Sequence, residues 1–96
     1  MTGPSRSSDG LDPRRRKLKF RSWHRGIREM DLIMGRFADA CIDRLSEAEL
    51  GELELLMEVP DAELFSWIIG AQPAPASYDN AVLRRMRAFH RNSQAS

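Results

Sequence analysis

The chain has 96 residues, of which 42% are hydrophobic, 30% charged and 7% aromatic, and this length suits one domain while excluding most barrels, sandwiches and doubly wound cofactor domains. No apolar run approaches the roughly 18–20 residues of a membrane span, and the lone cysteine cannot form an internal disulfide, so we expect a soluble intracellular protein. The charges behind the net charge of +1 are sorted along the chain. Residues 1–36 carry ten basic and four acidic side chains, and residues 37–83 carry one basic and ten acidic side chains. Residues 84–96 carry four basic side chains and no acidic ones. This sorting predicts a partner surface of mixed charge and not the general basic excess of a nucleic-acid-binding domain.

The first 13 residues are rich in glycine, serine, proline and aspartate and hold almost no apolar side chains. Such a segment cannot bury enough surface to offset its ordering entropy, so we expect a disordered N-terminal arm over residues 1–13. The segment also lacks the apolar core of a signal peptide. The basic run from Arg14 to Lys17 fits a solvated helix start, a nucleic-acid patch or the end of a transit peptide. Asp9 and Asp12 weigh against the last of these, because transit peptides are poor in acidic residues.

Two helices are expected next. Asp12 is a favourable N-cap and Pro13 suits the first helical position; the apolar residues of this helix are Leu18, Phe20 and Trp23. Gly26 interrupts the pattern at a place where the chain can turn. A second helix is predicted by an apolar stripe with spacings of three and four residues, namely Ile27, Met30, Met34, Phe37, Cys41 and Leu45. Gly35 lowers the helix propensity of this segment and permits close packing.

A third and a fourth helix follow. Residues 46–49, Ser-Glu-Ala-Glu, form a capping box, and the inward residues of the third helix are predicted to be Leu50, Leu53, Leu56 and Met57. Pro60 ends this helix. Asp61 is expected to cap a fourth helix over residues 62–69, which Gly70 closes at the C′ position.

A loop with two prolines, residues 72–76, leads to a last helix over about residues 78–90. Its apolar residues recur at helical spacing and are Tyr78, Val82, Met86 and Phe89. Alternation of apolar and polar residues never persists long enough for a strand. We therefore predict an all-α protein, a small five-helix bundle forming a single domain over residues 14–92, with a disordered tail at residues 93–96.

Residue types that carry catalysis or bind metals are scattered along the chain. His24 and His90 are far apart in the sequence, and neither has a further ligand at metal-binding spacing. Cys41 lies on the apolar stripe and is expected to be a buried hydrophobe. There is no glycine-rich phosphate loop, and the glutamates are expected to be solvated. These patterns predict a protein that is not an enzyme and holds no metal.

One segment departs from this pattern: Ser-Trp-His-Arg-Gly-Ile-Arg-Glu-Met-Asp at residues 22–31. If the second helix starts near Gly26, Arg25 and Glu29 project from the same side of its first turn. The order Arg before Glu is the less favourable one for an ion pair within a helix, so helix stability does not explain it. Gly26 lets another backbone approach, and Trp23 is a residue type enriched at binding hot spots. The alternative interpretation is a solvated helix start with Trp23 in the core.

Arg25, Gly26 and Glu29, followed by Asp31, resemble the RGxxE signature of the succinate dehydrogenase assembly factor family, which comprises the small bacterial SdhE proteins and their mitochondrial relatives. A second block is similar to the fourth-helix segment of that family and the proline-containing loop after it, namely Asp61, Leu64, Phe65, Trp67, Ile68, Gly70 and Pro73. The resemblance covers residues 14–92. It implies a five-helix bundle that binds the flavoprotein subunit of succinate dehydrogenase and promotes covalent attachment of FAD to it. Some members also serve fumarate reductase.

The resemblance further implies that the histidine that receives FAD belongs to the partner, so this chain needs neither a catalytic residue nor a cofactor of its own. The implied partner-binding residues are Arg25, Gly26 and Glu29, flanked by Trp23, His24 and Asp31. His24 stands where relatives often have arginine, which replaces a permanent charge with a titratable one. We expect a monomer when free, no membrane or nucleic-acid partner, and a location in the bacterial cytoplasm or, in a eukaryote, the mitochondrial matrix.

Two questions stay open at the level of the sequence. The alternative function is a nucleic-acid-binding bundle that uses the basic residues of the first helix, namely Arg14, Arg15, Arg16, Lys17, Lys19 and Arg21. It predicts steeply salt-dependent binding, and the net charge of −9 over residues 37–83 weighs against it. Within the assembly-factor hypothesis, the factor either holds the flavoprotein in one domain arrangement until the bond forms, or helps the reaction electrostatically through Arg25 or Glu29.

Overall fold

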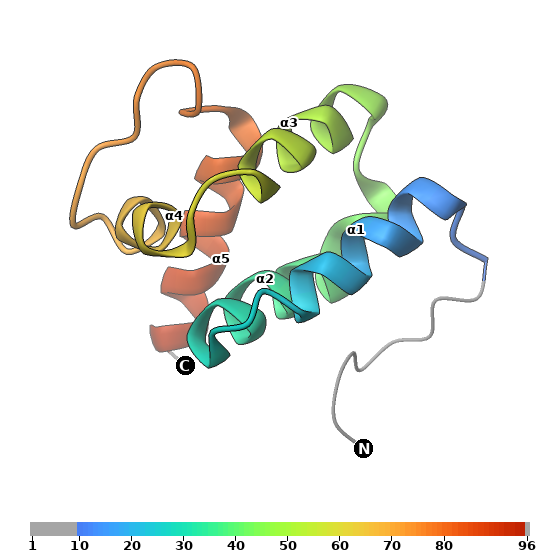
Figure 1. The fold of residues 1–96 in the computed structure, drawn as a ribbon, viewed down its shortest axis with the longest axis horizontal. Helices are drawn as coiled ribbons and strands as arrows, with labels where there is room; N and C mark the ends of the chain where they lie inside the picture. Colours follow the sequence, from blue (N-terminus) through green and yellow to red (C-terminus); the bar gives the residue numbers. More distant parts are fainter. Residues whose placement is uncertain (1–9, 96) are drawn as a thin grey trace. The chain divides into compact units, whose positions relative to one another are not determined.

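The computed structural model describes residues 10–95, with side chains described through Ser93. Within this range the chain is all-α, as predicted, and contains five α-helices and one short 3-10 helix (Figure 1). Their bounds are α1 Pro13–Trp23, α2 Arg28–Cys41, η1 Ile42–Arg44, α3 Glu47–Met57, α4 Asp61–Ile68 and α5 Ala81–Ala95. The chain divides into two compact units between Ser46 and Glu47. None of the described helices is long and apolar enough to cross a membrane.

The first and last helices overlap the ends of the expected arm and tail. Most of the expected arm, residues 1–9, lies outside the described residues. Helix α1 begins at Pro13, and helix α5 continues to Ala95, so residues 93–95 of the expected tail are helical.

Helix α1 begins as its sequence predicts. Asp12 has an extended backbone and is the N-cap, and its Oδ1 accepts a hydrogen bond of 2.8 Å from the backbone N–H of Arg15. Pro13 occupies the first helical position, where its missing N–H leaves no bond unmade. The hydrogen bond from the Arg15 backbone, together with the Arg15 side chain, lowers the pKa of the Asp12 carboxyl.

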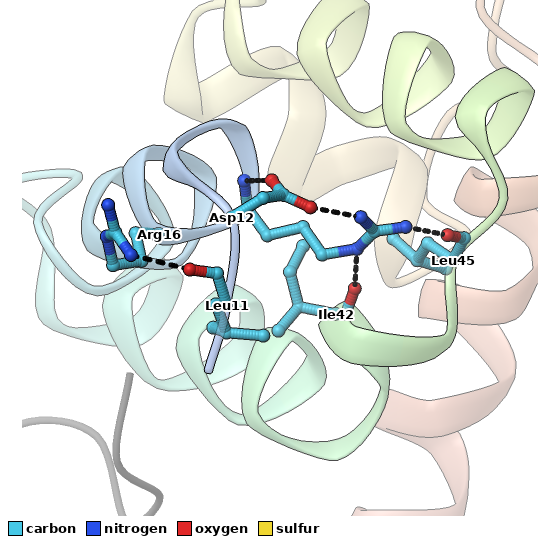
Figure 2. A network of polar contacts seen from close by, with 6 residues as sticks. Leu11, Asp12, Arg16, Ile42 and Leu45 are labelled. Atoms are coloured by element: carbon cyan, nitrogen blue, oxygen red, sulfur yellow. Dashed lines mark hydrogen bonds and ion pairs between the residues drawn. The ribbon is translucent and has the colours of Figure 1, made fainter. Parts of the chain in front are cut away.

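The Arg15 side chain ties the start of α1 to the end of the α2–η1 segment. Figure 2 shows three of the residues that it contacts, Asp12, Ile42 and Leu45. Its Nε donates to the backbone oxygen of Ile42 at 2.9 Å, and its Nη2 donates to the backbone oxygen of Leu45. Its Nη1 pairs with Asp12 Oδ2. Helix ends leave carbonyl groups without partners inside the helix, and one guanidinium here satisfies two carbonyls in the segment where α2 and η1 end.

Helices α1 and α2 lie side by side in the first unit (Figure 1). Most of the predicted apolar stripe is buried: Met30, Met34, Phe37, Cys41 and Leu45. Ile27 is an exception, because it precedes the helix as an extended N-cap residue and 45% of it is exposed. The prediction that Ile27 belongs to the inward stripe was therefore wrong. The thiol of Cys41 is buried and donates to the backbone oxygen of Phe37, so its predicted burial is confirmed.

In the second unit, α5 packs against both α3 and α4. The predicted inward residues of α3 are all buried, and the other buried residues of this unit's helices are Leu64, Trp67, Ile68, Val82, Leu83 and Met86. Gly70 has a φ of 82° and follows the C-cap Ile69. The N–H of Ala71 bonds to the Ser66 carbonyl at 2.9 Å, so the predicted C′ glycine is confirmed.

Two predicted helix starts in this unit were wrong. Asp61 is the first residue of α4 and not its cap, because Pro60 takes the N-cap position without a side-chain hydrogen bond. Helix α5 begins at Ala81, beyond Tyr78. The start of α5 is fixed by two side-chain acceptors: Asn80 Oδ1 binds the N–H of Leu83 at 2.9 Å, and Glu52 Oε1 from α3 binds the N–H of Val82 at 3.1 Å.

Candidate partner-binding site

The RGxxE segment lies where α1 gives way to α2. Trp23 ends α1, residues 24–27 form the connecting turn, and Glu29 is the second residue of α2. Because α2 begins only at Arg28, Arg25 lies outside the helix. The expectation that Arg25 and Glu29 share a helix face was therefore wrong: the backbone of the turn, and not helical periodicity, sets the direction of Arg25.

Trp23 is directed toward α2. Its indole Nε1 donates to Asp39 Oδ1 at 3.3 Å, and the Nζ of Lys19 lies 3.5 Å from the same oxygen. The side chains of Lys19 and Asp39 are only 3% and 6% exposed, so this is a buried ion pair to which the indole adds a third group. Removing one partner of such a pair typically costs about 3–5 kcal/mol. The half-buried Trp23 is thus anchored at the end of α1.

The turn itself requires glycine at position 26. Gly26 has a φ of 100°, and residues other than glycine rarely adopt this backbone conformation. A Cβ at this position would meet no atom within 4 Å, so the space beside Gly26 is open. Glycine is therefore needed for the backbone conformation, and its missing side chain also leaves room for an approaching molecule.

Asp31 binds the turn from inside α2. Its Oδ1 accepts hydrogen bonds from the backbone N–H of Arg25 at 2.6 Å and of Gly26 at 3.2 Å. The Asp31 N–H in turn donates to the backbone oxygen of Ile27 at 2.9 Å. The side chain of Asp31 is half-buried, and the residue contacts three successive residues of the turn.

Glu29 points to solvent. It is exposed and lies in the first turn of α2, where the positive end of the helix dipole favours a negative charge. Within the described part of the chain, its carboxylate has no hydrogen bond or ion pair. Arg25 is half-buried. The two charged residues of the motif therefore differ in their surroundings.

His24 and Phe20 form an exposed aromatic pair beside the turn. Their ring centroids are 4.0 Å apart with an interplanar angle of 19°, and His24 Nδ1 lies 2.7 Å from the backbone oxygen of Phe20. Phe20 is 63% exposed. It is one of two large apolar side chains exposed in the described part of the first unit, and the other is Ile27. Both lie within a few residues of the motif.

Sequence reasoning missed the exposure of Phe20 and Ile27. For Phe20 a signal was present: it lies two residues after the apolar Leu18, and this spacing places the two residues on opposite sides of a helix with 3.6 residues per turn. For Ile27 the sequence held no comparable signal, because its exposure follows from the late start of α2.

Among the described residues, no group of three or more histidine, cysteine, aspartate or glutamate side chains is arranged to hold a metal ion. The predicted site residues Trp23, His24, Arg25, Gly26, Glu29 and Asp31 are brought together at the α1–α2 turn. Of these, Trp23 and Asp31 make contacts inside the first unit, while His24, Gly26 and Glu29 are exposed.

Comparison with known proteins gives a consistent result. Residues 16–90 match the model of the Sdh5 family, described as flavinator of succinate dehydrogenase. The chain is 42% identical over 80 residues to the FAD assembly factor SdhE of Acetobacter pasteurianus, which covers 83% of this chain and 73% of that protein. It is 33% identical over 82 residues to the mitochondrial succinate dehydrogenase assembly factor 2 of Dictyostelium discoideum, and this match covers 85% of this chain and 58% of that protein. It is 28% identical over 89 residues to the Danio rerio protein of the same name, and this match covers 91% of this chain and 56% of that protein. The chain thus spans a little over half the length of these two mitochondrial relatives.

Proposed function

The chain belongs to the Sdh5 family of succinate dehydrogenase flavinators, and from this membership we propose that it is an assembly factor for a flavoprotein. Its partner is the flavoprotein subunit of succinate dehydrogenase, and it promotes the covalent attachment of FAD to that subunit. The flavoprotein of fumarate reductase is the second partner to be tested. The factor itself supplies no catalytic residue and holds no FAD, because the flavin and the histidine that receives it both belong to the partner.

The structural observation that supports this proposal is the exposure of Gly26 and Glu29 in the RGxxE segment. Glu29 presents a solvent-facing carboxylate, and Gly26 leaves open space beside the turn. Phe20 and Ile27 add exposed apolar surface close to these charges. Aromatic and apolar anchors are typical of the core of a protein interface, and polar or charged groups are typical of its rim.

Each residue of the site then has a role. Arg25 and Glu29 make charge-assisted contacts with the flavoprotein, and the partner backbone approaches Gly26. Phe20, His24 and Ile27 pack against the partner's apolar surface. Trp23 and Asp31 take part through the turn whose two ends they hold.

The factor acts by binding one domain arrangement of the flavoprotein more tightly than the others. A preference of about 2–3 kcal/mol shifts the population of that arrangement roughly 30- to 150-fold. Such a preference raises the rate of flavin attachment if the favoured arrangement places the receiving histidine next to the flavin. Direct electrostatic help from Arg25 or Glu29 would need these side chains to reach the flavin, and is the alternative mechanism.

The relatives support the proposed setting. They include a bacterial protein and several mitochondrial ones, so we place this protein in the bacterial cytoplasm or, in a eukaryote, in the mitochondrial matrix. It acts as a monomer that forms a complex with one flavoprotein subunit.

The contacts of the basic residues weigh against nucleic-acid binding. Lys19 is buried in its ion pair with Asp39. Arg15 is bound to two backbone carbonyls and to Asp12. Two of the six basic residues in the alternative hypothesis are therefore committed to the fold, which leaves fewer charges for a phosphate backbone.

A reconstituted reaction tests the proposal. The purified apo-flavoprotein subunit is incubated with FAD, with and without this protein, and covalent flavin is measured as fluorescence of the denatured subunit in a gel. We expect faster attachment in the presence of the protein. An equal rate with and without it would contradict the proposal. Binding to duplex DNA that weakens steeply between 50 and 200 mM salt, as expected for contacts with several phosphates, would favour the alternative.

A further inference from the structure

We propose that Asp31 is a positioning residue that holds the turn of the RGxxE motif in its binding conformation, and that it does not itself contact the flavoprotein. This inference rests on the proposed function and adds to it the residue that sets the geometry of the motif.

The hydrogen bonds of Asp31 carry the first step. One carboxylate oxygen, Oδ1, accepts the N–H groups of both Arg25 and Gly26, at 2.6 and 3.2 Å. The Asp31 N–H also binds the carbonyl of Ile27. All three residues between His24 and the first residue of α2 are therefore tied to Asp31.

The conformation of the turn explains why it needs such a restraint. Gly26 has a φ of 100°. No atom lies within 4 Å of the position that a Cβ would take there, so packing on that side does not hold the residue in place. Glycine has more backbone freedom than any other residue, so a glycine turn without hydrogen bonds samples many conformations. The two N–H bonds to Asp31 select one of them.

The other end of the turn is held independently. Trp23, the residue before His24, is anchored by Asp39 and by the close approach of its ring to Gly35. The turn is thus fixed at Trp23 in α1 and at Asp31 in α2, and the direction of Arg25 follows from these two anchors. A factor whose turn is ordered only part of the time binds with an affinity reduced by that fraction.

Two conservative variants separate positioning from direct contact. Asp31→Asn keeps an oxygen at the position of Oδ1 and removes the charge. Asp31→Glu keeps the charge and displaces the carboxylate by one methylene group. If Asp31 positions the turn, Asn retains most of the affinity for the flavoprotein and Glu loses most of it; if its charge contacts the partner, the order is reversed.

The measurement is the concentration of factor that gives half-maximal flavin attachment, together with the maximal rate at saturation. We expect Asp31→Asn to stay within about threefold of the wild type and Asp31→Glu to raise the half-saturating concentration about tenfold or more. The maximal rate should be retained in both, because a positioning residue changes the competent fraction and not the bound complex. Glu63→Ala, an exposed acidic residue in the first turn of α4, is the matched control.

Amide hydrogen exchange of the free protein provides a readout without the partner. The Arg25 and Gly26 amides should exchange faster in Asp31→Glu than in Asp31→Asn, with the α2 amides unchanged. Equal exchange in the two variants, or a half-saturating concentration that rises more for Asn than for Glu, would overturn the inference. If the wild type does not accelerate attachment at all, the proposed function fails and the role of Asp31 in binding fails with it. The exchange rates then still decide whether Asp31 orders the turn.

Discussion

The indole ring of Trp23 lies against the backbone of Gly35, so closely that a Cβ atom at residue 35 would stand 2.3 Å from Trp23 Cδ2. Real Cβ atoms do not approach other atoms so closely. Glycine in the middle of α2 therefore serves packing, and its cost in helix propensity, about 1 kcal/mol relative to alanine, is offset by the contact between the two helices that carry the motif.

Gly35→Ala should lower stability although alanine is the better helix former. The Trp23 ring must move to admit the new methyl group, and overpacking of this kind typically costs about 1–3 kcal/mol. Thermal melts measure the effect. In a Trp23→Leu background the same change should be neutral or stabilising, because the clash is gone. An equal loss in both backgrounds would show that the ring contact does not determine the effect.

Gly26→Ala and Gly26→Arg separate backbone strain from the size of the side chain. Both introduce a Cβ at a φ that disfavours it, so both should destabilise the protein by a similar amount, about 1–3 kcal/mol. If a partner backbone approaches this position, Gly26→Arg should weaken flavoprotein binding at least tenfold more than Gly26→Ala. Binding and melting temperature are measured on the same samples. Equal binding by the two variants would mean that glycine is needed for the conformation of the turn alone.

Phe20→Ser should weaken binding while leaving the fold almost unchanged. The exposed ring contributes to stability mainly through its stack on His24, worth about 0.5–1.5 kcal/mol, whereas an aromatic side chain buried in an interface contributes about 2 kcal/mol or more. Leu55→Ser, at an exposed apolar residue on α3, is the control. Titration calorimetry with the flavoprotein should show a clear loss of affinity for Phe20→Ser only. The same affinity for both variants would remove Phe20 from the interface.

Asp12 should make the start of α1 sensitive to acid. Its pKa is lowered below the ordinary value of 3.8, chiefly by the Arg15 backbone hydrogen bond. A carboxyl whose pKa is depressed in the folded state contributes stability above its unfolded pKa, and this contribution is lost as the pH falls through the folded pKa. Carbon-detected NMR titration should give a value below 3.8 for Asp12. The Asp12→Asn variant should therefore lose less stability than the wild type when the pH falls below 4. The same dependence of stability on pH in both proteins would contradict this role of Asp12.

The sequence predicts those features that depend on local chemistry. The Asp12 cap, the C′ role of Gly70 and the buried stripe from Met30 to Leu45 follow from neighbouring residues and helical spacing, and the structure confirms them. The position of Ile27 was mispredicted because its apolar side chain continues the spacing of α2 into residues that are not helical.

The internal support of the motif could not be predicted from the sequence. The buried pair of Lys19 and Asp39 joins residues on two different helices, and spacing along one helix carries no information about such a contact. The position of Asp31 beside RGxxE does not reveal that its carboxylate accepts hydrogen bonds from the N–H groups of Arg25 and Gly26. Exposed and inward-facing members of one motif are distinguished only once the turn is folded.

Glu29→Ala tests the central claim most directly. Glu29 is exposed in the first turn of α2, so its loss should cost the fold only the helix-dipole term, about 0.3–1 kcal/mol. If it contacts the flavoprotein, the same change removes a charge-assisted interaction worth about 2–5 kcal/mol when buried in the complex. Glu63→Ala loses the same dipole term in α4 and serves as the control. We expect near-normal melting of both variants, with covalent flavin on the partner strongly reduced for Glu29→Ala and normal for Glu63→Ala. Full flavin attachment with Glu29→Ala, or a loss that merely follows a collapsed melting temperature, would contradict the claim that this residue forms the interface.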